Sequence, residues 1–158
     1  MPTFLMEILM KNCFLFDLDG TLANGDHRLH HIHKMPKDWT SYFAACGDDA
    51  PIPHMITILL SISRETDIFI TSGRSDEVRS ETMAWLRTHI PDLDWMDGDV
   101  YMRAAGDYRP DDMIKIEMLE NIRQLGYNVL AAFDDRYRVV NAWRDAGIPC
   151  LQVAPGYF

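Results

Sequence analysis

The chain has 158 residues, 47% of them apolar, which is enough for one domain with a substantial core. Its 4 Trp and 7 Phe, without low-complexity tracts, argue against a disordered chain. The net charge of −9 disfavours an extended nucleic-acid surface, which requires a basic stripe, but is compatible with a short phosphorylated end or a small phosphate ester.

The first sixteen residues are apolar but are interrupted by Glu7 and Lys11. They are too short to span a membrane and lack the basic start and cleavage site of a signal peptide. Met10 is an alternative start, so residues 1–9 are predicted to be dispensable.

The cysteines form no Cys-x-x-Cys pair and are odd in number, which predicts neither a disulfide framework nor a zinc site. They are Cys13, Cys46 and Cys150. A reducing cytoplasm is the expected setting.

Strand-like apolar runs alternate with helical spacing of apolar residues. This pattern predicts a single α/β domain over residues 1–158, with a Rossmann-like parallel sheet flanked by helices. The expected strands are Cys13–Phe16, Asp67–Thr71, Val100–Met102, Val129–Phe133 and Cys150–Val153. The expected helices contain the apolar positions within 55–60, 78–86, 114–125 and 139–146. Gly126 and Gly147 stand where two of these helices are expected to end.

Residues 24–53 fit no strand–helix unit, so we expect a small cap inserted after the first strand, above the sheet edge. A short helix there is expected to bury Trp39, Phe43 and Cys46. The aromatic residues, with Tyr42, can form the core of the cap or stack a nucleobase. The histidines are interpreted as a polar surface rather than a metal site, although substrate contact is an alternative; they are His27, His30, His31 and His33.

Four polar clusters follow predicted strands or open predicted helices, so they are expected to meet at one edge of the sheet. They are Asp17 with Asp19, Thr71-Ser72-Gly73-Arg74, Lys115, and Asp134-Asp135-Arg136. In an extended segment Asp17 and Asp19 project to the same side, and the chain turns at Gly20.

The chemistry of these groups is complementary. Asp17, Asp134 and a backbone carbonyl offer the oxygen ligands that suit Mg²⁺, which reduces repulsion between a carboxylate nucleophile and a phosphate. Ser72 and Lys115 can donate hydrogen bonds to the non-bridging oxygens, and the planar fork of Arg74 matches a phosphate.

Each cluster also has an ordinary structural explanation. An Asp-Gly pair is typical of turns, as is the segment around Gly73. Lys115 stands four residues after Asp111, which is the spacing of a helical surface pair. Asp134 and Asp135 can mark the start of a helix, and Arg28 can be a solvated arginine. The ordered set of clusters favours function over these alternatives.

The order Asp-x-Asp-Gly-Thr, Ser, Lys, Asp-Asp resembles the haloacid dehalogenase superfamily of phosphohydrolases. Within it, the chain is similar to the 3′-phosphatase domain of phage polynucleotide kinase–phosphatase. The segments that carry this likeness are 16–23, 72–74, 106–115, 133–136 and 152–158.

The resemblance implies that Asp17 is the nucleophile and forms an aspartyl-phosphate, while Asp19 protonates the leaving oxygen and then activates water. It implies that Asp17, Asp134 and the carbonyl of Asp19 bind Mg²⁺. Asp135 would hold a metal-bound water or orient Lys115. Further positions match substrate-binding or otherwise important ones in that domain: Arg28, Thr71, Gly73, Arg74 and Asp111.

The implied activity is Mg²⁺-dependent removal of 3′-phosphate from nucleotide or oligonucleotide ends, in the cytoplasm of a bacterial or phage-infected cell. The alternatives are a 5′-nucleotidase or small-molecule phosphatase and, in another class, a non-catalytic protein that binds a phosphorylated ligand. The sequence contains no Gly-x-x-x-x-Gly-Lys-Ser/Thr loop, so no kinase half is expected. The segment 27–53 does not align with the phage domain beyond Arg28 and leaves the substrate open.

Overall fold

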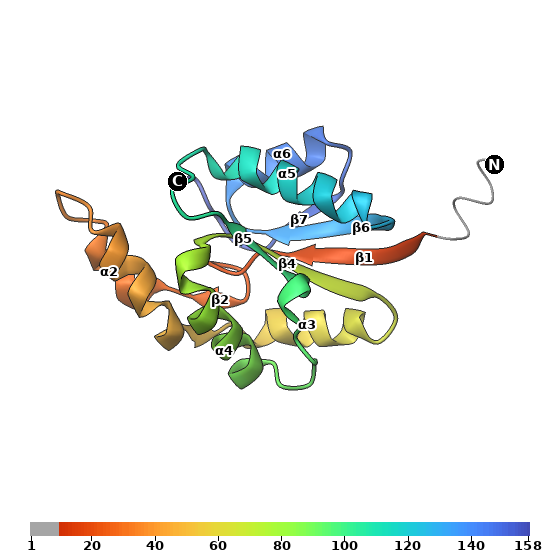
Figure 1. Ribbon diagram of the computed structural model, residues 1–158, viewed down its shortest axis with the longest axis horizontal. Coiled ribbons are helices and arrows are strands. Elements are labelled where there is room, and N and C mark those ends of the chain that lie inside the picture. The colour runs from red at the N-terminus through yellow and green to blue at the C-terminus, as the bar shows by residue number, and fades with distance from the viewer. Residues whose placement is uncertain (1–9) are drawn as a thin grey trace.

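A five-stranded parallel sheet organises the protein, shown as a computed structural model that describes residues 10–158 (Figure 1). The strand order is β5-β4-β1-β6-β7. The strands are β1 Lys11–Phe16, β4 Asp67–Ser75, β5 Val100–Arg103, β6 Tyr127–Asp134 and β7 Cys150–Gln152. The predicted α/β class with a parallel sheet flanked by helices is confirmed.

Helices cover both faces of this sheet: α3 and α4 lie on one face, and α5 and α6 lie on the other (Figure 1). Their bounds are α3 Pro53–Ser63, α4 Arg79–His89, α5 Asp111–Gln124 and α6 Tyr137–Asp145. Because strand side chains alternate, Phe16 and Ile70 pack with α3 and α4, while Leu15 and Phe69 pack with α5 and α6. Two covered faces explain why the strands read as nearly continuous apolar runs.

The predicted ends of α5 and α6 are confirmed. Gly126 and Gly147 follow the two helices with φ of +90° and +82°, a left-handed conformation that glycine adopts without steric cost. Each helix therefore stops where the chain must turn back toward the sheet.

The sequence prediction ends the two strands β4 and β6 too early. Ser72-Gly73-Arg74 lies inside β4 rather than after it, because pairing with β5 resumes at Ser75 beyond a register shift that begins at Ser72. Likewise, Asp134 is the last residue of β6 rather than the first one beyond it. The polar residues are thus held by the sheet itself, not by a loop.

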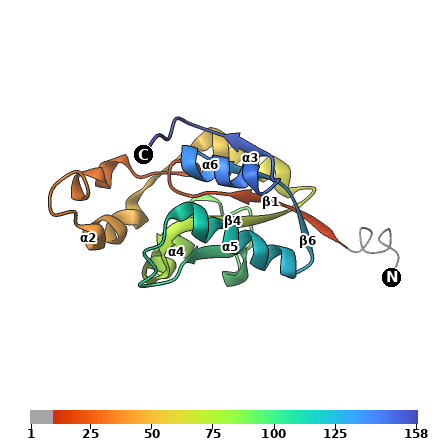
Figure 2. The same cartoon turned by 90° about the horizontal axis from the view of Figure 1, so that it is seen from above.

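The insertion after β1 leaves and rejoins the domain through a small antiparallel pair, β2 Ala23–Asn24 and β3 Ala50–Pro51. Between them lie the helix α2 Trp39–Ala44 and two 3₁₀ turns, Asp26–His31 and Ala45–Asp48. Figure 2 shows this segment projecting past the end of the sheet opposite to the start of β1.

The prediction that Trp39 is buried in the cap is wrong: Trp39 is 48% exposed, whereas Cys46 is buried and Phe43 half-buried. Trp39 is the first residue of a six-residue helix, and its two aromatic partners lie in the same helix. These are Phe43 and Tyr42, at centroid distances of 6.0 and 5.7 Å.

Among the residues that the structure describes, none of the helices has the length and apolar character needed to cross a bilayer. The prediction that residues 1–9 are dispensable lies outside the described residues.

Candidate active site

Three buried carboxylates meet at the carboxyl edge of the sheet. Phe16 and Phe133 are paired across β1 and β6, so Asp17 and Asp134, which directly follow them in the chain, emerge side by side. The backbone N–H of Asp17 donates to the carbonyl of Phe133 at 2.9 Å. One carboxylate oxygen of each of Asp17, Asp134 and Asp135 lies within 4.8 Å of the others.

Lys115 is the cation of this group. Its buried ammonium donates to Asp17 Oδ1 at 2.7 Å and to Asp134 Oδ2 at 2.9 Å. Burial alone would lower the pKa of Lys115, but Asp134 and Asp17 raise it above its usual value, so the ammonium stays charged. A helical surface pair with Asp111 is therefore the wrong interpretation of Lys115.

Three carboxylates facing one ammonium leave an excess of negative charge. Burial and the charge of Asp134 raise the pKa of Asp17 well above its usual range, against the opposing effect of Lys115. Burial and the same neighbour raise the pKa of Asp135 to about 6. Such a site gains by binding a divalent cation, which removes the repulsion.

The donor set fits Mg²⁺. Magnesium prefers oxygen ligands, and Asp17, Asp134 and Asp135 each offer a carboxylate oxygen within 4.8 Å of the other two. The carboxylate of Asp19 is not in this group; the family resemblance implies that Asp19 binds the metal through its backbone carbonyl.

The turn after Asp17 keeps room for Asp135. Gly20 has φ +83°, and a Cβ at this position would lie 2.2 Å from Asp135 Oδ2. The next residue, Thr21, is buried and its hydroxyl donates to Asp17 Oδ2 at 3.1 Å. The two oxygens of Asp17 are thus oriented by Thr21 and Lys115.

Asp19 points to two buried arginines. Arg74 donates through Nε and Nη2 at 2.7–3.1 Å, and Arg28 donates through Nη2 at 2.6 Å. Burial would raise the pKa of Asp19, but the charges and hydrogen bonds of Arg74 and Arg28 lower it overall. Asp19 is therefore ionised at neutral pH in this arrangement.

A second acid, Asp49, completes this network and was missed in the sequence analysis. Its buried carboxylate accepts from Arg28 Nε at 2.8 Å, Arg28 Nη2 at 2.7 Å and Arg74 Nη2 at 2.8 Å, and His27 Nε2 lies 2.8 Å away. Nothing in the sequence separates Asp49 from the exposed Asp48 beside it.

The interpretation of Arg28 as a solvated surface residue is wrong. Arg28 is fully buried, and its guanidinium lies 4.2 Å from the centroid of the Tyr42 ring. Arg74 is also fully buried and gives its donors to Asp19, Asp49 and Thr82. The guanidinium groups of both arginines therefore donate their hydrogen bonds to oxygen atoms of the protein itself.

The remaining substrate-binding candidates line β4 and the start of α5. Thr71 and Ser72 are buried, and the Ser72 hydroxyl accepts the backbone N–H of Arg74 at 3.1 Å. A Cβ at Gly73 would lie 2.9 Å from Asp111 Oδ1, so these two positions are in close approach.

Asp111 is paired with Arg103 and Arg136. Arg109 and Arg138 are also ion-paired, with Asp107, Glu117 and Asp112 as their acids. All four of these arginines are thus neutralised by neighbouring acids.

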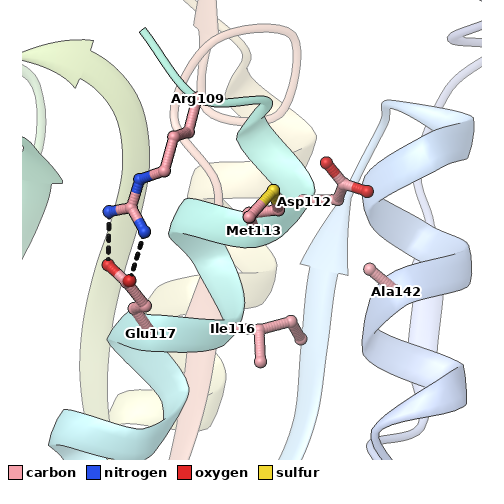
Figure 3. Close-up of a pocket in the computed structure, with 6 residues that line it drawn as sticks. All are labelled: Arg109, Asp112, Met113, Ile116, Glu117 and Ala142. Carbon is pink, nitrogen blue, oxygen red and sulfur yellow. Dashed lines mark hydrogen bonds and ion pairs between the residues drawn. The ribbon is translucent and has the colours of Figure 1, made fainter. Parts of the chain in front are cut away.

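A separate shallow groove of about 350 Å³ runs between α5 and α6 (Figure 3). Figure 3 shows Arg109 paired with Glu117 at one side and Asp112 pointing toward α6. The lining residues are Arg109, Asp112, Met113, Ile116, Glu117 and Ala142. None of them belongs to the carboxylate cluster or to the arginine network.

Residues 11–158 match the sequence model of a family described as the polynucleotide kinase PNKP phosphatase domain. A curated relative, a putative bifunctional polynucleotide kinase/RNA ligase of Autographa californica nuclear polyhedrosis virus, is 30% identical over 138 residues. That alignment covers 87% of this chain but only 18% of the viral protein.

Solved structures have the same fold. The chain matches a protein chain in the structure of the Pnkp1/Rnl/Hen1 RNA repair complex with a TM-score of 0.75 and 28% identity. The match covers 94% of this chain and 44% of the chain in the complex. This chain also matches the class C acid phosphatase of Bacillus anthracis with a TM-score of 0.68 and 15% identity, covering 94% and 68%. This chain therefore spans less than half of the RNA repair protein.

Proposed function

Because the chain belongs to the PNKP phosphatase-domain family and is a phosphoric monoester hydrolase, we propose that it removes the 3′-phosphate from nucleotide or oligonucleotide ends through an aspartyl-phosphate. The observation that carries the proposal is the buried Asp17 carboxylate, oriented by Thr21 and Lys115 and grouped with Asp134 and Asp135.

In the first step, Asp17 attacks phosphorus and the bond from phosphorus to the ester oxygen breaks. The leaving oxygen takes a proton from Asp19. In the second step, water attacks the same phosphorus, Asp19 takes a proton from that water, and the bond to Asp17 breaks to release inorganic phosphate. Asp17 and Asp19 thereby return to their starting states.

The pKa of Asp19 supports its role as the base of the second step, since Arg74 and Arg28 keep it low and the carboxylate ionised. For the first step Asp19 must carry a proton. A bound phosphate dianion beside Asp19 raises its pKa, because a nearby like charge disfavours ionisation. Substrate binding therefore favours the protonated form, and transfer of that proton to the leaving oxygen returns Asp19 to the ionised form that acts as the base.

Other residues act on the phosphate oxygens. Lys115 and Ser72 are proposed to donate hydrogen bonds to the non-bridging oxygens in the transition state. Asp17, Asp134 and Asp135 would hold Mg²⁺, which, when bound, neutralises phosphate charge and lowers its repulsion with the nucleophile.

The test is phosphate release, with and without Mg²⁺, from a 3′-phosphorylated oligonucleotide, a 3′-mononucleotide and a panel of 5′-mononucleotides. We expect Mg²⁺-dependent release with a preference for the 3′-phosphates, and no turnover by a folded Asp17→Asn variant. Equal or better release from 5′-monophosphates would overturn the substrate assignment, and full activity of Asp17→Asn would overturn the nucleophile.

A further inference from the structure

Three exposed aromatic rings lie near Arg136, next to the metal-binding candidate Asp135: Tyr137 follows Arg136 in the chain, Phe158 contacts its guanidinium, and Tyr157 packs on Tyr137. Tyr157 is 83% exposed, Phe158 73% and Tyr137 47%. We propose that these rings form a stacking platform for the last bases of a single-stranded nucleic-acid end, an inference that rests on the function proposed above. The term aromatic platform is used below for Tyr137, Tyr157 and Phe158.

The backbone holds the platform close to the carboxylate cluster. The carbonyl of Gly156 accepts the N–H of Tyr137 at 2.7 Å, and Gln152 Nε2 donates to the carbonyl of Asp135 at 3.1 Å. A Cβ at Gly156 would lie 2.2 Å from the Asp135 carbonyl oxygen, so the two segments are in direct contact. Figures 1 and 2 show the end of the chain at the edge of the sheet that faces the cap.

The rings expose their surfaces rather than filling a core. The centroids of Tyr137 and Tyr157 are 5.4 Å apart with their planes tilted by 34°. The guanidinium of Arg136 lies 5.4 Å from the centroid of the Phe158 ring. Aromatic rings beside an arginine are the surface on which successive unpaired bases stack in proteins that bind single strands.

Charge favours stacking over backbone attraction as the source of affinity. The chain carries a net charge of −9, and Arg136 is itself paired with Asp111, so little free positive charge is available for phosphates. Stacking needs no such charge and accepts any base, because every base has a π-face. Bases inside a duplex already stack on each other, so an unpaired end is the better ligand.

The experiment compares kcat/KM for a 3′-phosphorylated single-stranded oligonucleotide with kcat/KM for p-nitrophenyl phosphate, which has no base to stack. We divide kcat/KM for the oligonucleotide by kcat/KM for p-nitrophenyl phosphate. We expect this ratio to fall about tenfold in Tyr157→Ala and about tenfold in Phe158→Ala, mainly because KM for the oligonucleotide rises. Tyr157→Phe keeps the ring and is expected to keep most of the ratio. Leu125→Ala, which removes an exposed apolar side chain at the end of α5, is the matched control.

Annealing the same strand into a blunt duplex is expected to raise its KM. The platform proposal would be overturned, with the proposed function left intact, by an unchanged ratio in both alanine variants. A blunt duplex hydrolysed with the same KM as the single strand would have the same meaning. A change of oligomeric state in Tyr157→Ala with an unchanged ratio would likewise overturn it in favour of a protein interface. If the wild type hydrolyses p-nitrophenyl phosphate but no oligonucleotide, the proposed substrate fails, and the platform fails with it.

Discussion

The replacement Asp49→Asn tests whether the cap is locked to the sheet domain by charge. It preserves the size of the side chain but removes the negative charge that Arg28 and Arg74 share. Both guanidinium groups are fully buried, so among residues 10–158 they would be left with Asp19 as their only paired carboxylate. Breaking a buried ion pair by removing one partner costs about 3–5 kcal/mol.

This cost is a large part of the roughly 5–15 kcal/mol by which a domain is stable. For a domain of this size we expect Tm to fall by about 6–20 °C, at two to four degrees per kcal/mol. The assay is thermal and urea unfolding of the full chain, with Asp48→Asn as the control, because Asp48 is exposed beside Asp49. The control should change stability by less than about 0.5 kcal/mol. Equal stability of the two variants would refute the reasoning.

Three further results are expected. Gly20→Ala places a Cβ 2.2 Å from Asp135 Oδ2 at φ +83°, so calorimetric titration should show weaker Mg²⁺ binding; unchanged affinity would contradict the geometry. Lys115→Met should lower kcat for p-nitrophenyl phosphate about 100- to 1000-fold, and a smaller loss would argue against its transition-state role. In metal-free protein, burial and Asp134 raise the pKa of Asp135 from 3.8 to about 6. Between these pH values only the unfolded state loses the proton, so stability falls as pH rises. Urea denaturation should show that Asp135→Asn has a higher free energy of unfolding than the wild type at pH 7 and the same free energy of unfolding below pH 4.

The sheet and the carboxylate cluster were accessible from sequence because both depend on local signals. Apolar runs mark buried strands, and parallel strands bring their carboxyl ends to one edge, so Asp17, Lys115 and Asp134 were expected to meet there. The extension of β4 through Arg74 was not expected, because a Ser-Gly-Arg segment is typical of turns and the continued pairing depends on β5.

The arginine network could not be derived in the same way. Asp49 meets Arg28 across 21 residues of the insertion, which has no regular periodicity. Its position depends on β2 and β3 pairing and on Trp85 Nε1 donating to the Asp49 carbonyl at 2.7 Å. The exposure of Trp39 was missed for a related reason, since the length of α2 determines how much of that ring finds neighbours.

The two-residue strands β2 and β3 have a consequence for how this domain can be altered. Because the insertion departs and returns at paired positions, Asn24 with Ala50 and Ala23 with Pro51, its length can change without displacing the sheet. Doubling the length of an inserted loop raises the entropic free-energy cost of closing it by only about 0.6 kcal/mol. The insertion can therefore be replaced by another segment, provided that the new segment supplies an arginine in place of Arg28 to pair with Asp19 and a carboxylate in place of Asp49 to pair with Arg74.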